Sequence, residues 1–197
     1  MLCHSEACER NKEPILQILR GAFAASRRVL EIGAGTGQHA VYFARHLPQL
    51  TWQSSETPEH LAALRARILE DGGVNLASPV ELDVRQHPWP VSNIDSVFSA
   101  NTLHIMSWQA VEEFFRGVGA LLGAAGVLCV YGPFRYAKRY TSDSNEAFDR
   151  YLKERDAASG IRDFEAVDAL AQGAGLSFVA DHDMPANNRT LLWRHGK

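Results

Sequence analysis

The feature that most constrains this chain is a glycine-rich turn, EIGAGTGQH, between an apolar run and an amphipathic run. The apolar run, residues 28–33, is typical of a short buried strand, and residues 38–48 carry apolar side chains at helical spacing up to Pro48. Gly33, Gly35 and Gly37 can adopt positive φ and let a ligand approach the main chain without meeting a Cβ atom. The helix begins at about Gly37, and its free N–H groups favour an anionic or electron-rich group. The pattern therefore predicts a ligand-binding loop in an α/β protein.

Strand-like and helix-like segments alternate along the rest of the chain. We expect helices over residues 13–23, 38–48, 57–73, 108–122 and 162–175. We expect strands over residues 28–33, 50–55, 79–84, 94–100, 126–132, 176–184 and 189–195. Such alternation indicates a mostly parallel sheet covered on both faces, and the two consecutive strands at the end must pair antiparallel.

No repeat or linker divides the sequence, so we expect one domain over residues 1–197. Residues 1–27 form its N-terminal extension and helix. The polar stretch 134–161 interrupts the rhythm of the chain. Together with residues 9–14, ERNKEP, this insert is expected to form a lid over a pocket.

The composition limits the class of protein and its location. Twenty basic and 23 acidic residues give a net charge of −3, which argues against a dedicated binder of nucleic acid or anionic membranes. No apolar run is long enough to span a membrane, and the first residues lack the apolar segment of a signal peptide. Three cysteines suit a reducing compartment, so we expect a cytoplasmic protein. The spacing of Cys3, His4 and Cys8 matches no zinc pattern, and we expect a frayed polar tail there and no metal site.

Two classes of ligand use a loop of this kind. The dinucleotide fingerprint is G-x-G-x-x-G, and counting from Gly33 its third position holds Gln38. Counting from Gly35 it holds Ala40, which the fingerprint tolerates, so a dinucleotide stays possible at this point. Glu56 ends the next strand about twenty residues later, where a carboxylate can accept both ribose hydroxyls of either ligand.

The run E-x-G-x-G-x-G, with Glu31 in the strand, resembles motif I of class I S-adenosylmethionine-dependent methyltransferases. The resemblance implies a Rossmann-like three-layer sandwich whose seven strands have the order 3-2-1-4-5-7-6, with strand 7 antiparallel. It implies that the loop holds the methionine and ribose parts of the cofactor, that Glu56 holds the ribose, and that Asp83 lies at the adenine. The cofactor-binding residues expected in this way are Glu31, Gly33, Ala34, Gly35, Thr36, Gly37, Glu56, Asp83, Val84, Asn101, Thr102 and Leu103.

A closer resemblance covers the chain from Glu9 to about Trp193. The segments ERNKEPIL, VLEIGAGTGQHAVYFA, LTWQSSE, NTLHIMSW, YGPF, SNEAFDRYL, SGIRDFE and MPANN together are similar to the methyltransferase-like 26 family, a family of predicted S-adenosylmethionine-dependent methyltransferases. That family usually ends its second strand with aspartate, where this chain has Glu56. The resemblance implies S-adenosylmethionine as cofactor and S-adenosylhomocysteine as its product.

The acceptor side of such a fold lies beyond the fourth and fifth strands. His104 is the one residue there that titrates near neutrality, so it is the expected general base, and Asn101 can orient the cofactor or the acceptor. A packing role for His104 and a turn role for Asn101 are the structural alternatives. The substrate-binding residues expected are Arg10, Asn11, Tyr131, Phe134, Asn145 and Asn187, each of which could instead be a core, turn or surface residue.

The acceptor itself is expected to be a small molecule. The run FRYAKRY interleaves basic and aromatic residues and could hold a nucleic acid, but it is short and the chain is acidic overall. The tetrapeptide N/D-P-P-Y/F of many base-modifying methyltransferases is replaced by NTLH. Two alternatives stay open: a protein that binds the cofactor without catalysis, and an NAD(P)-dependent oxidoreductase, for which no Tyr-x-x-x-Lys motif is present.

Overall fold

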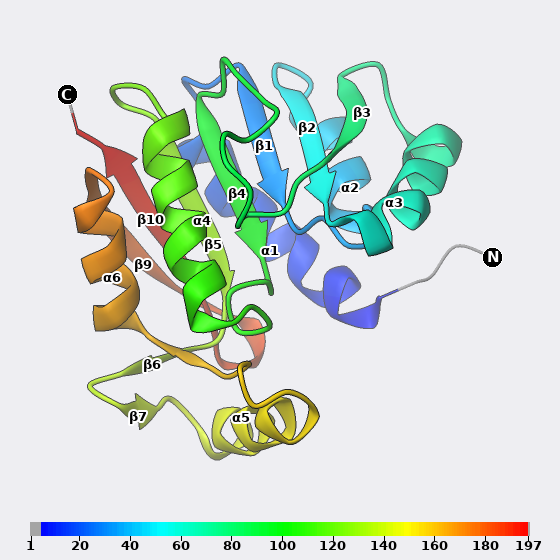
Figure 1. The fold of residues 1–197 in the computed structure, drawn as a ribbon. Helices are drawn as coiled ribbons and strands as arrows, with labels where there is room; N and C mark the ends of the chain where they lie inside the picture. Colours follow the sequence, from blue (N-terminus) through cyan, green and yellow to red (C-terminus); the bar gives the residue numbers. More distant parts are fainter. Residues whose placement is uncertain (1–4, 197) are drawn as a thin grey trace.

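A seven-stranded sheet forms the centre of the computed structural model, which describes residues 5–196 (Figure 1). Its strands, in chain order, are β1 (Arg28–Ile32), β2 (Thr51–Glu56), β3 (Leu76–Glu81), β4 (Ser96–Ala100), β5 (Val127–Gly132), β9 (Leu176–Met184) and β10 (Asn188–His195). Their order across the sheet is β3-β2-β1-β4-β5-β10-β9. Only β10 runs antiparallel to its neighbours, β5 and β9. The expected strand order, with the last strand inserted antiparallel, is confirmed.

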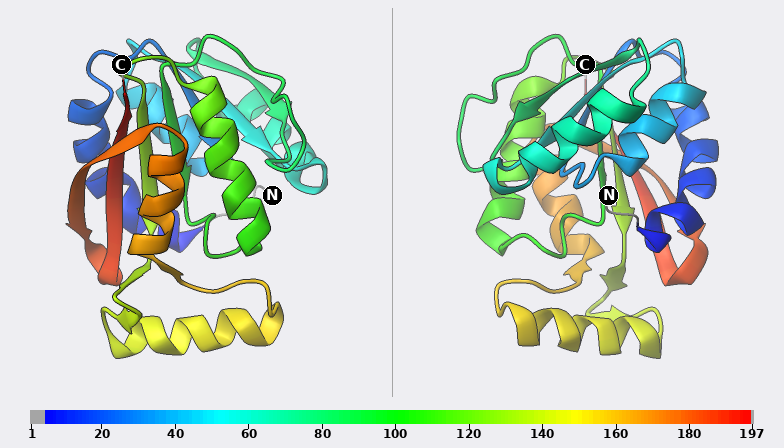
Figure 2. Two further views of the ribbon diagram at one scale, coloured as in Figure 1. Left: turned by 60° about the vertical axis from the view of Figure 1, so that its left-hand side comes forward. Right: turned by 90° about the vertical axis from the view of Figure 1, so that its right-hand side faces the viewer.

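Helices cover both faces of the sheet (Figure 2). On one face lie α1 (Glu6–Ala22) and α2 (Gln38–His46), with α3 (Pro58–Asp71) beside α2 on strands β2 and β3. On the other lie α4 (Trp108–Leu121) and α6 (Phe164–Gly173). The chain thus forms the expected α/β sandwich of three layers.

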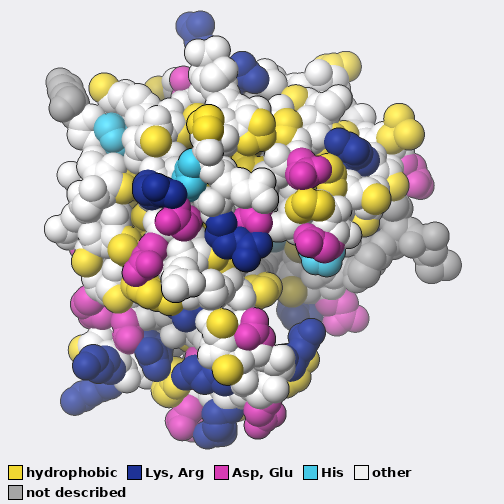
Figure 3. Space-filling view, viewed as in Figure 1, with side chains coloured by type: hydrophobic (Ala, Val, Ile, Leu, Met, Phe, Trp, Pro, Cys, Tyr) yellow, Lys and Arg dark blue, Asp and Glu magenta, His cyan; other side chains and the backbone are white. Residues whose placement is uncertain are grey.

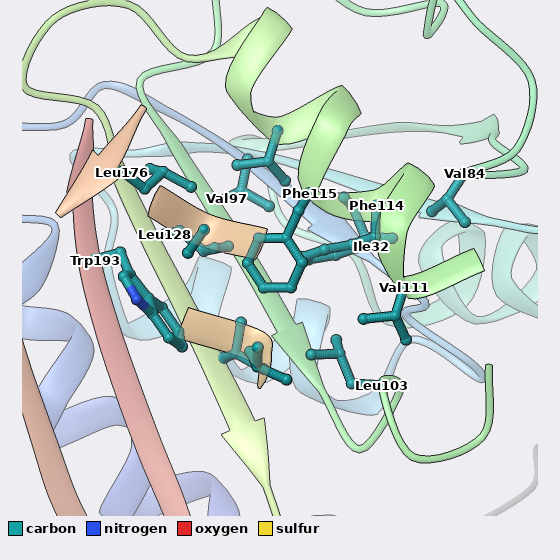
Figure 4. Packing of buried hydrophobic residues seen from close by; sticks show 14 of the residues in the cluster. Ile32, Val84, Val97, Leu103, Val111, Phe114, Phe115, Leu128, Leu176 and Trp193 are labelled. Carbon is teal, nitrogen blue, oxygen red and sulfur yellow. The ribbon is translucent and has the colours of Figure 1, made fainter. Parts of the chain in front are cut away.

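Each face of the sheet has its own hydrophobic core, because alternate residues of a strand point to opposite sides. On the α4 side, Phe114 and Phe115 of α4 pack onto Ile32 and Leu128 of the sheet (Figure 4). On the other side, the aromatic rings of Phe43, Trp52 and Phe98 meet at centroid distances of 5.4 to 5.8 Å. These two cores hold the strands in place and so position the carboxyl ends of the parallel strands along one edge of the sheet.

Helix α1 begins earlier than expected. The sequence predicted a helix over residues 13–23 and a frayed tail before it, whereas α1 starts at Glu6. Ser5 caps the helix by accepting a hydrogen bond from the N–H of Cys8, and the acidic residues Glu6 and Glu9 occupy the first turn, where the helix dipole favours negative charge. The prediction of a tail is therefore wrong for residues 6–8, while Cys3 and His4 lie outside the described residues.

The insert after β5 has its own secondary structure. It contains β6 (Phe134–Tyr136), β7 (Arg139–Tyr140), α5 (Asp143–Arg155) and β8 (Arg162–Asp163), with β6 between β7 and β8 in a small sheet. Asp149 organises it: one carboxylate oxygen accepts the N–H of Ile161 at 2.6 Å, and the other accepts Tyr140 and Lys153. In Figure 1 this insert lies below the ends of β4 and β5.

Strand β3 differs in register from the prediction. It spans Leu76–Glu81, three residues before the expected 79–84, so Asp83 lies in the turn that follows the strand. Pro79 sits inside the strand, which is tolerated because β3 is an edge strand. No helix of the described residues is long and apolar enough to cross a membrane.

Candidate functional site

The glycine loop lies where the order of the strands reverses. Strands β1 and β4 are neighbours in the sheet, but the helices that follow them, α2 and α4, pack on opposite faces. Ligands of open α/β sheets bind in the crevice beyond the carboxyl ends of the strands at this point. The loops of the two strands touch there, since a Cβ atom on Gly33 would lie 2.7 Å from Cγ2 of Thr102. The candidate site is therefore the edge formed by residues 33–37 and 101–104.

The three glycines are needed for different reasons. All three have positive φ: +73° at Gly33, +56° at Gly35 and +77° at Gly37. A Cβ atom on Gly33 would meet Thr102, and one on Gly37 would lie 2.7 Å from Cδ1 of Leu64, so both glycines permit internal packing. At Gly35, apart from the glycine and its two chain neighbours, no atom of the described residues lies within 4 Å of the Cβ position. Gly35 alone of the three therefore turns a bare main chain towards open space.

Glu56 lies directly beside that open position. Its carboxylate accepts the N–H of Gly35 at 2.7 Å and the N–H of Thr57 at 2.9 Å. These two backbone donors hold the side chain at the end of β2, and it is 7% exposed. A carboxylate oxygen can accept more than one hydrogen bond, so the group keeps lone pairs for the hydroxyls of a ribose. Glu56 and the glycine loop are thus joined by a direct hydrogen bond at the candidate site.

Two other acidic residues have internal partners. Glu31 is 1% exposed, and its carboxylate accepts the indole N–H of Trp52 at 2.7 Å. Burial, opposed by this hydrogen bond and assisted by the charge of Glu56, raises the pKa of Glu31 to about 8. Asp83 accepts the guanidinium of Arg85, which is the main cause of its lowered pKa.

The remaining expected cofactor residues are distributed around the loop. Val84 and Leu103 are buried in the core on the α4 side, and the hydroxyl of Thr102 donates to the carbonyl of Ala100. Their roles towards a ligand stay predictions.

His104 and Asn101 come together at the end of β5. Both side chains face Gly132: a Cβ atom there would lie 3.6 Å from Nδ1 of His104 and 4.0 Å from Oδ1 of Asn101. Asn101 has a left-handed backbone, with φ of +56°, and its N–H donates to the carbonyl of Tyr131. His104 is 6% exposed and its ring packs edge-on against Phe148 of α5 at 5.4 Å. Burial, helped by the charge of Arg162, lowers the pKa of His104 to about 4, so its ring is neutral at physiological pH.

The expected substrate residues divide into groups. Asn11 of α1 lies against the hydroxyl of Tyr131, and Asn145 of α5 donates to the carbonyl of Asn187 at 2.9 Å. Phe134 does not line an edge but is buried in the core on the α4 side. Arg10 is exposed on α1 and pairs with Glu6 across one helical turn, at 3.6 Å.

Three residues near this edge were missed by the sequence reasoning: His39, Phe148 and Gly132. His39 is buried on α2, with Nε2 2.7 Å from Oδ1 of Asn11 and Nδ1 3.7 Å from Sγ of Cys8. Its position on the inner face of the helix after the glycine loop was the available signal. Between Ser5 and Gly196, no three His, Cys, Asp or Glu side chains are close enough together to hold a metal ion.

The fold is similar to that of several solved methyltransferases. An O-methyltransferase family protein from Burkholderia thailandensis matches with a TM-score of 0.82 and 19% identity, over 94% of this chain and 56% of that one. The S-adenosylmethionine-dependent methyltransferase SibL, in its apo form, matches with a TM-score of 0.80 and 21% identity, over 97% and 56%. Human N-acetylserotonin methyltransferase in complex with SAM matches with a TM-score of 0.75 and 16% identity, over 97% and 58%. The chain spans little more than half the length of these proteins, and at these identities the likeness shows the fold.

A protein-family model gives the second comparison. The family described as "Protein of unknown function (DUF938)" matches residues 3–195, which is nearly the whole chain.

Proposed function

The chain belongs to the DUF938 family, and we propose that it is an S-adenosylmethionine-dependent methyltransferase with a small-molecule acceptor. The observation that carries the proposal is the pairing of Gly35 with Glu56 at the point where the strand order reverses. A bare main chain facing open space beside a fixed carboxylate fits a nucleoside, whose ribose hydroxyls donate to the carboxylate. The similarity of the sequence to the methyltransferase-like 26 family supports the same cofactor.

The topology favours this cofactor over a dinucleotide. In the dinucleotide-binding fold six strands follow the order 3-2-1-4-5-6, whereas here β10 is inserted antiparallel between β5 and β9. The third glycine of the dinucleotide fingerprint is also replaced, by Gln38 or Ala40. Among the similar structures, human N-acetylserotonin methyltransferase was described with SAM bound.

The residues of the edge have separable tasks in methyl transfer. When bound, S-adenosylmethionine supplies an electrophilic methyl group on a sulfonium. Glu56 would hold the nucleoside, and the side chains at the ends of β4 and β5 would orient the acceptor, which lowers the barrier mainly by positioning. His104 is neutral at physiological pH and would accept the proton that the acceptor loses, as a weak base, because burial lowers its pKa to about 4.

A small-molecule acceptor fits this edge better than a nucleic acid. Five of the side chains there are uncharged at neutral pH: His104, Asn101, Tyr131, Asn11 and Asn145. The charges that act on them come from Arg162 at His104 and Arg10 at Tyr131. In the run FRYAKRY, Arg135 is paired with Asp163 at 2.8 Å and lies over the ring of Tyr140, so neither side chain is free to hold a phosphate or stack a base. On the face shown in Figure 3, basic side chains of the insert are mixed with acidic ones.

Calorimetric titration tests the proposal. We expect micromolar binding of S-adenosylmethionine and S-adenosylhomocysteine, and none of NAD or NADP at the same concentrations. Preferential binding of NAD or NADP would refute the proposed cofactor. Incubation with labelled S-adenosylmethionine and a metabolite extract should then give a labelled small molecule. A protein that binds the cofactor and labels nothing would be a binding protein.

A further inference from the structure

The loop that carries His104 is bound to the end of the insert. Its residues 103–106 (the His104 loop) have four carbonyls, and each accepts a hydrogen bond from residues 159–162 (the exit segment of the insert). The donors are a main-chain N–H, a hydroxyl and two nitrogens of one guanidinium. The proposed reaction assigns no task to this contact, although it surrounds the expected base.

Arg162 bridges the two ends of the His104 loop. Its Nε donates to the carbonyl of Leu103 at 3.1 Å, and its Nη2 donates to the carbonyl of Met106. The same Nη2 donates to the carbonyl of Ala158 at 3.0 Å, and the guanidinium lies over the ring of Trp108, 6.0 Å from its centroid. Because the donors of a planar guanidinium are fixed relative to one another, these bonds set the distance between the two ends of the loop.

Two further hydrogen bonds hold the middle of the His104 loop. The N–H of Gly160 donates to the carbonyl of His104 at 2.8 Å, and the hydroxyl of Ser159 donates to the carbonyl of Ile105 at 2.7 Å. The loop also closes on itself, since the N–H of Ile105 donates to the carbonyl of Thr102 at 3.0 Å. The main chain on both sides of the histidine is therefore fixed by hydrogen bonds.

The exit segment is itself anchored within the insert. Asp149 of α5 is 1% exposed, and its carboxylate accepts the N–H of Ile161, in the middle of residues 159–162, at 2.6 Å. The same helix supplies Phe148, whose ring meets that of His104 edge-on at 5.4 Å. The insert thus contacts the histidine through both its main chain and its ring.

The ring nitrogens of His104 are not used in these contacts. Within residues 5–196, no side chain or main-chain group forms a hydrogen bond with either nitrogen, and the ring contact with Phe148 is edge-on. A general base must lie within hydrogen-bond reach of the proton that it takes. Since no partner orients the ring through its nitrogens, its position depends on the main chain that the exit segment holds.

We propose that Arg162 is a positioning residue for the general base, because it fixes the loop from which the ring of His104 reaches the acceptor. The inference rests on the proposed function and deepens it. It gives the end of the insert a task in methyl transfer, whereas the cofactor is held by the glycine loop on the neighbouring strands. A change at Arg162 should therefore reduce turnover and leave the binding of S-adenosylhomocysteine intact.

Three variants separate the charge of Arg162 from its geometry. Arg162→Met removes the guanidinium and keeps an unbranched apolar stem. Arg162→Lys keeps the positive charge, but a single ammonium lacks the planar fork that bridges two carbonyls. Arg150→Met is the matched control, because that guanidinium is exposed on α5 and pairs only with Glu146, one helical turn away, at 3.2 Å.

Turnover and cofactor affinity are measured side by side. Turnover is the rate at which labelled S-adenosylmethionine labels a metabolite extract, and affinity for S-adenosylhomocysteine is measured by calorimetry. In Arg162→Met we expect turnover to fall about tenfold and the affinity to stay within about twofold of wild type. Arg162→Lys should remain several-fold below wild type in turnover, and Arg150→Met should change neither quantity. Full turnover in Arg162→Lys would show that the charge alone matters and would overturn the positioning role.

The ring of His104 gives a second readout that needs no acceptor. In NMR spectra of protein with labelled histidine, we expect one sharp Cε1–H signal from this ring in wild type and a shifted or broadened one in both Arg162 variants, because the signal depends on the nearby ring of Phe148. Among the described residues, Arg162 is the charged group that lowers the pKa of His104. That pKa should therefore rise in Arg162→Met and stay near 4 in Arg162→Lys.

The remaining outcomes are distinguishable. An unchanged ring signal or unchanged turnover in Arg162→Met overturns the inference, and so does an equal loss of affinity for S-adenosylhomocysteine. If Arg162→Met does not fold, Ser159→Ala replaces it: this change removes one of the four hydrogen bonds and no charge, and should lower turnover about threefold. Wild-type protein that fails to bind S-adenosylhomocysteine, or binds it and labels nothing, refutes the proposed function instead, while the ring signal still decides whether Arg162 positions His104.

Discussion

Gly35→Ala separates the folding role of the glycine loop from its binding role. At φ of +56°, an L-residue costs about 1–2 kcal/mol relative to its relaxed conformation. No described atom lies within 4 Å of the new Cβ, so no clash adds to this cost. For a chain of this size, each kcal/mol lowers Tm by about 2–4 °C, so we expect a folded variant with Tm reduced by about 2–8 °C.

Binding should suffer more than folding. If the nucleoside rests on the main chain at Gly35, the added methyl group overlaps it, and an overlap of this size costs about 1–3 kcal/mol. That cost corresponds to a loss of roughly 5- to 150-fold in affinity for S-adenosylhomocysteine, measured by calorimetry. Valine at this position should abolish binding, since its branched side chain fills more of the same space.

Gly175→Ala is the matched control for this prediction. Gly175 also has a positive φ, of +81°, but lies just before β9, and the atoms nearest to its Cβ would be those of the His195 ring, the first at 3.0 Å. We expect a similar decrease in Tm with unchanged affinity. If Gly35→Ala folds and binds S-adenosylhomocysteine as tightly as wild type, the ligand does not rest on this loop and the reasoning is refuted.

Three further predictions concern pH, packing and turnover. The folded chain holds a proton on Glu31 up to about pH 8, whereas the unfolded chain releases it near pH 4.5. As the pH rises between these values, the free energy of unfolding of wild type should therefore fall by about 1.4 kcal/mol per pH unit relative to that of Glu31→Gln, measured by denaturant titration. Parallel pH dependences of the two proteins would contradict the raised pKa. Gly117→Ala should lower the free energy of unfolding by about 1–3 kcal/mol, because its Cβ would lie 2.0 Å from Cζ2 of Trp89, whereas Gly173→Ala, with open space around it, should not lower Tm. His104→Ala should leave the affinity for the cofactor unchanged and reduce turnover; unchanged turnover would exclude His104 as the base. Because the pKa of His104 is about 4, the turnover of wild type should show no inflection from this ring between about pH 6 and pH 8.

The strands and their mostly parallel arrangement could be predicted because they depend on patterns within single segments, whereas the order of the strands was implied only by the resemblance to class I methyltransferases. Apolar runs, the glycine loop and the final pair of strands each have local signatures, and the parallel arrangement follows from their alternation. Strand β3 lies three residues earlier than the sequence predicts, because an edge strand tolerates proline in its interior and Pro79 therefore does not mark its beginning. The start of α1 was missed since its first turn is polar, and its only signal was Ser5 before two acidic residues.

The site was predictable only in part. Glu56 and the glycines are recognisable because their spacing reflects a strand, a turn and the next strand. The contact between His39 and Asn11 joins positions 28 residues apart on different helices, and no periodicity specifies it. The sequence of α5 contains helix-start signals, namely Ser142 as the N-cap and acidic residues in the first turn. The helix was not predicted because it is mostly polar and lacks a clear apolar face.

The two ends of the insert lie side by side, since Phe134 of β6 is paired with Arg162 of β8. When the two ends of a segment are adjacent in space, the positions of the strands before and after it do not depend on the length of the segment. The chain between these two anchoring residues can therefore be exchanged for a longer or shorter one while the seven-stranded scaffold keeps its register. Under the proposed function, such an exchange would change what covers His104, which Phe148 of α5 contacts, and would leave the hydrogen bond between Gly35 and Glu56 in place.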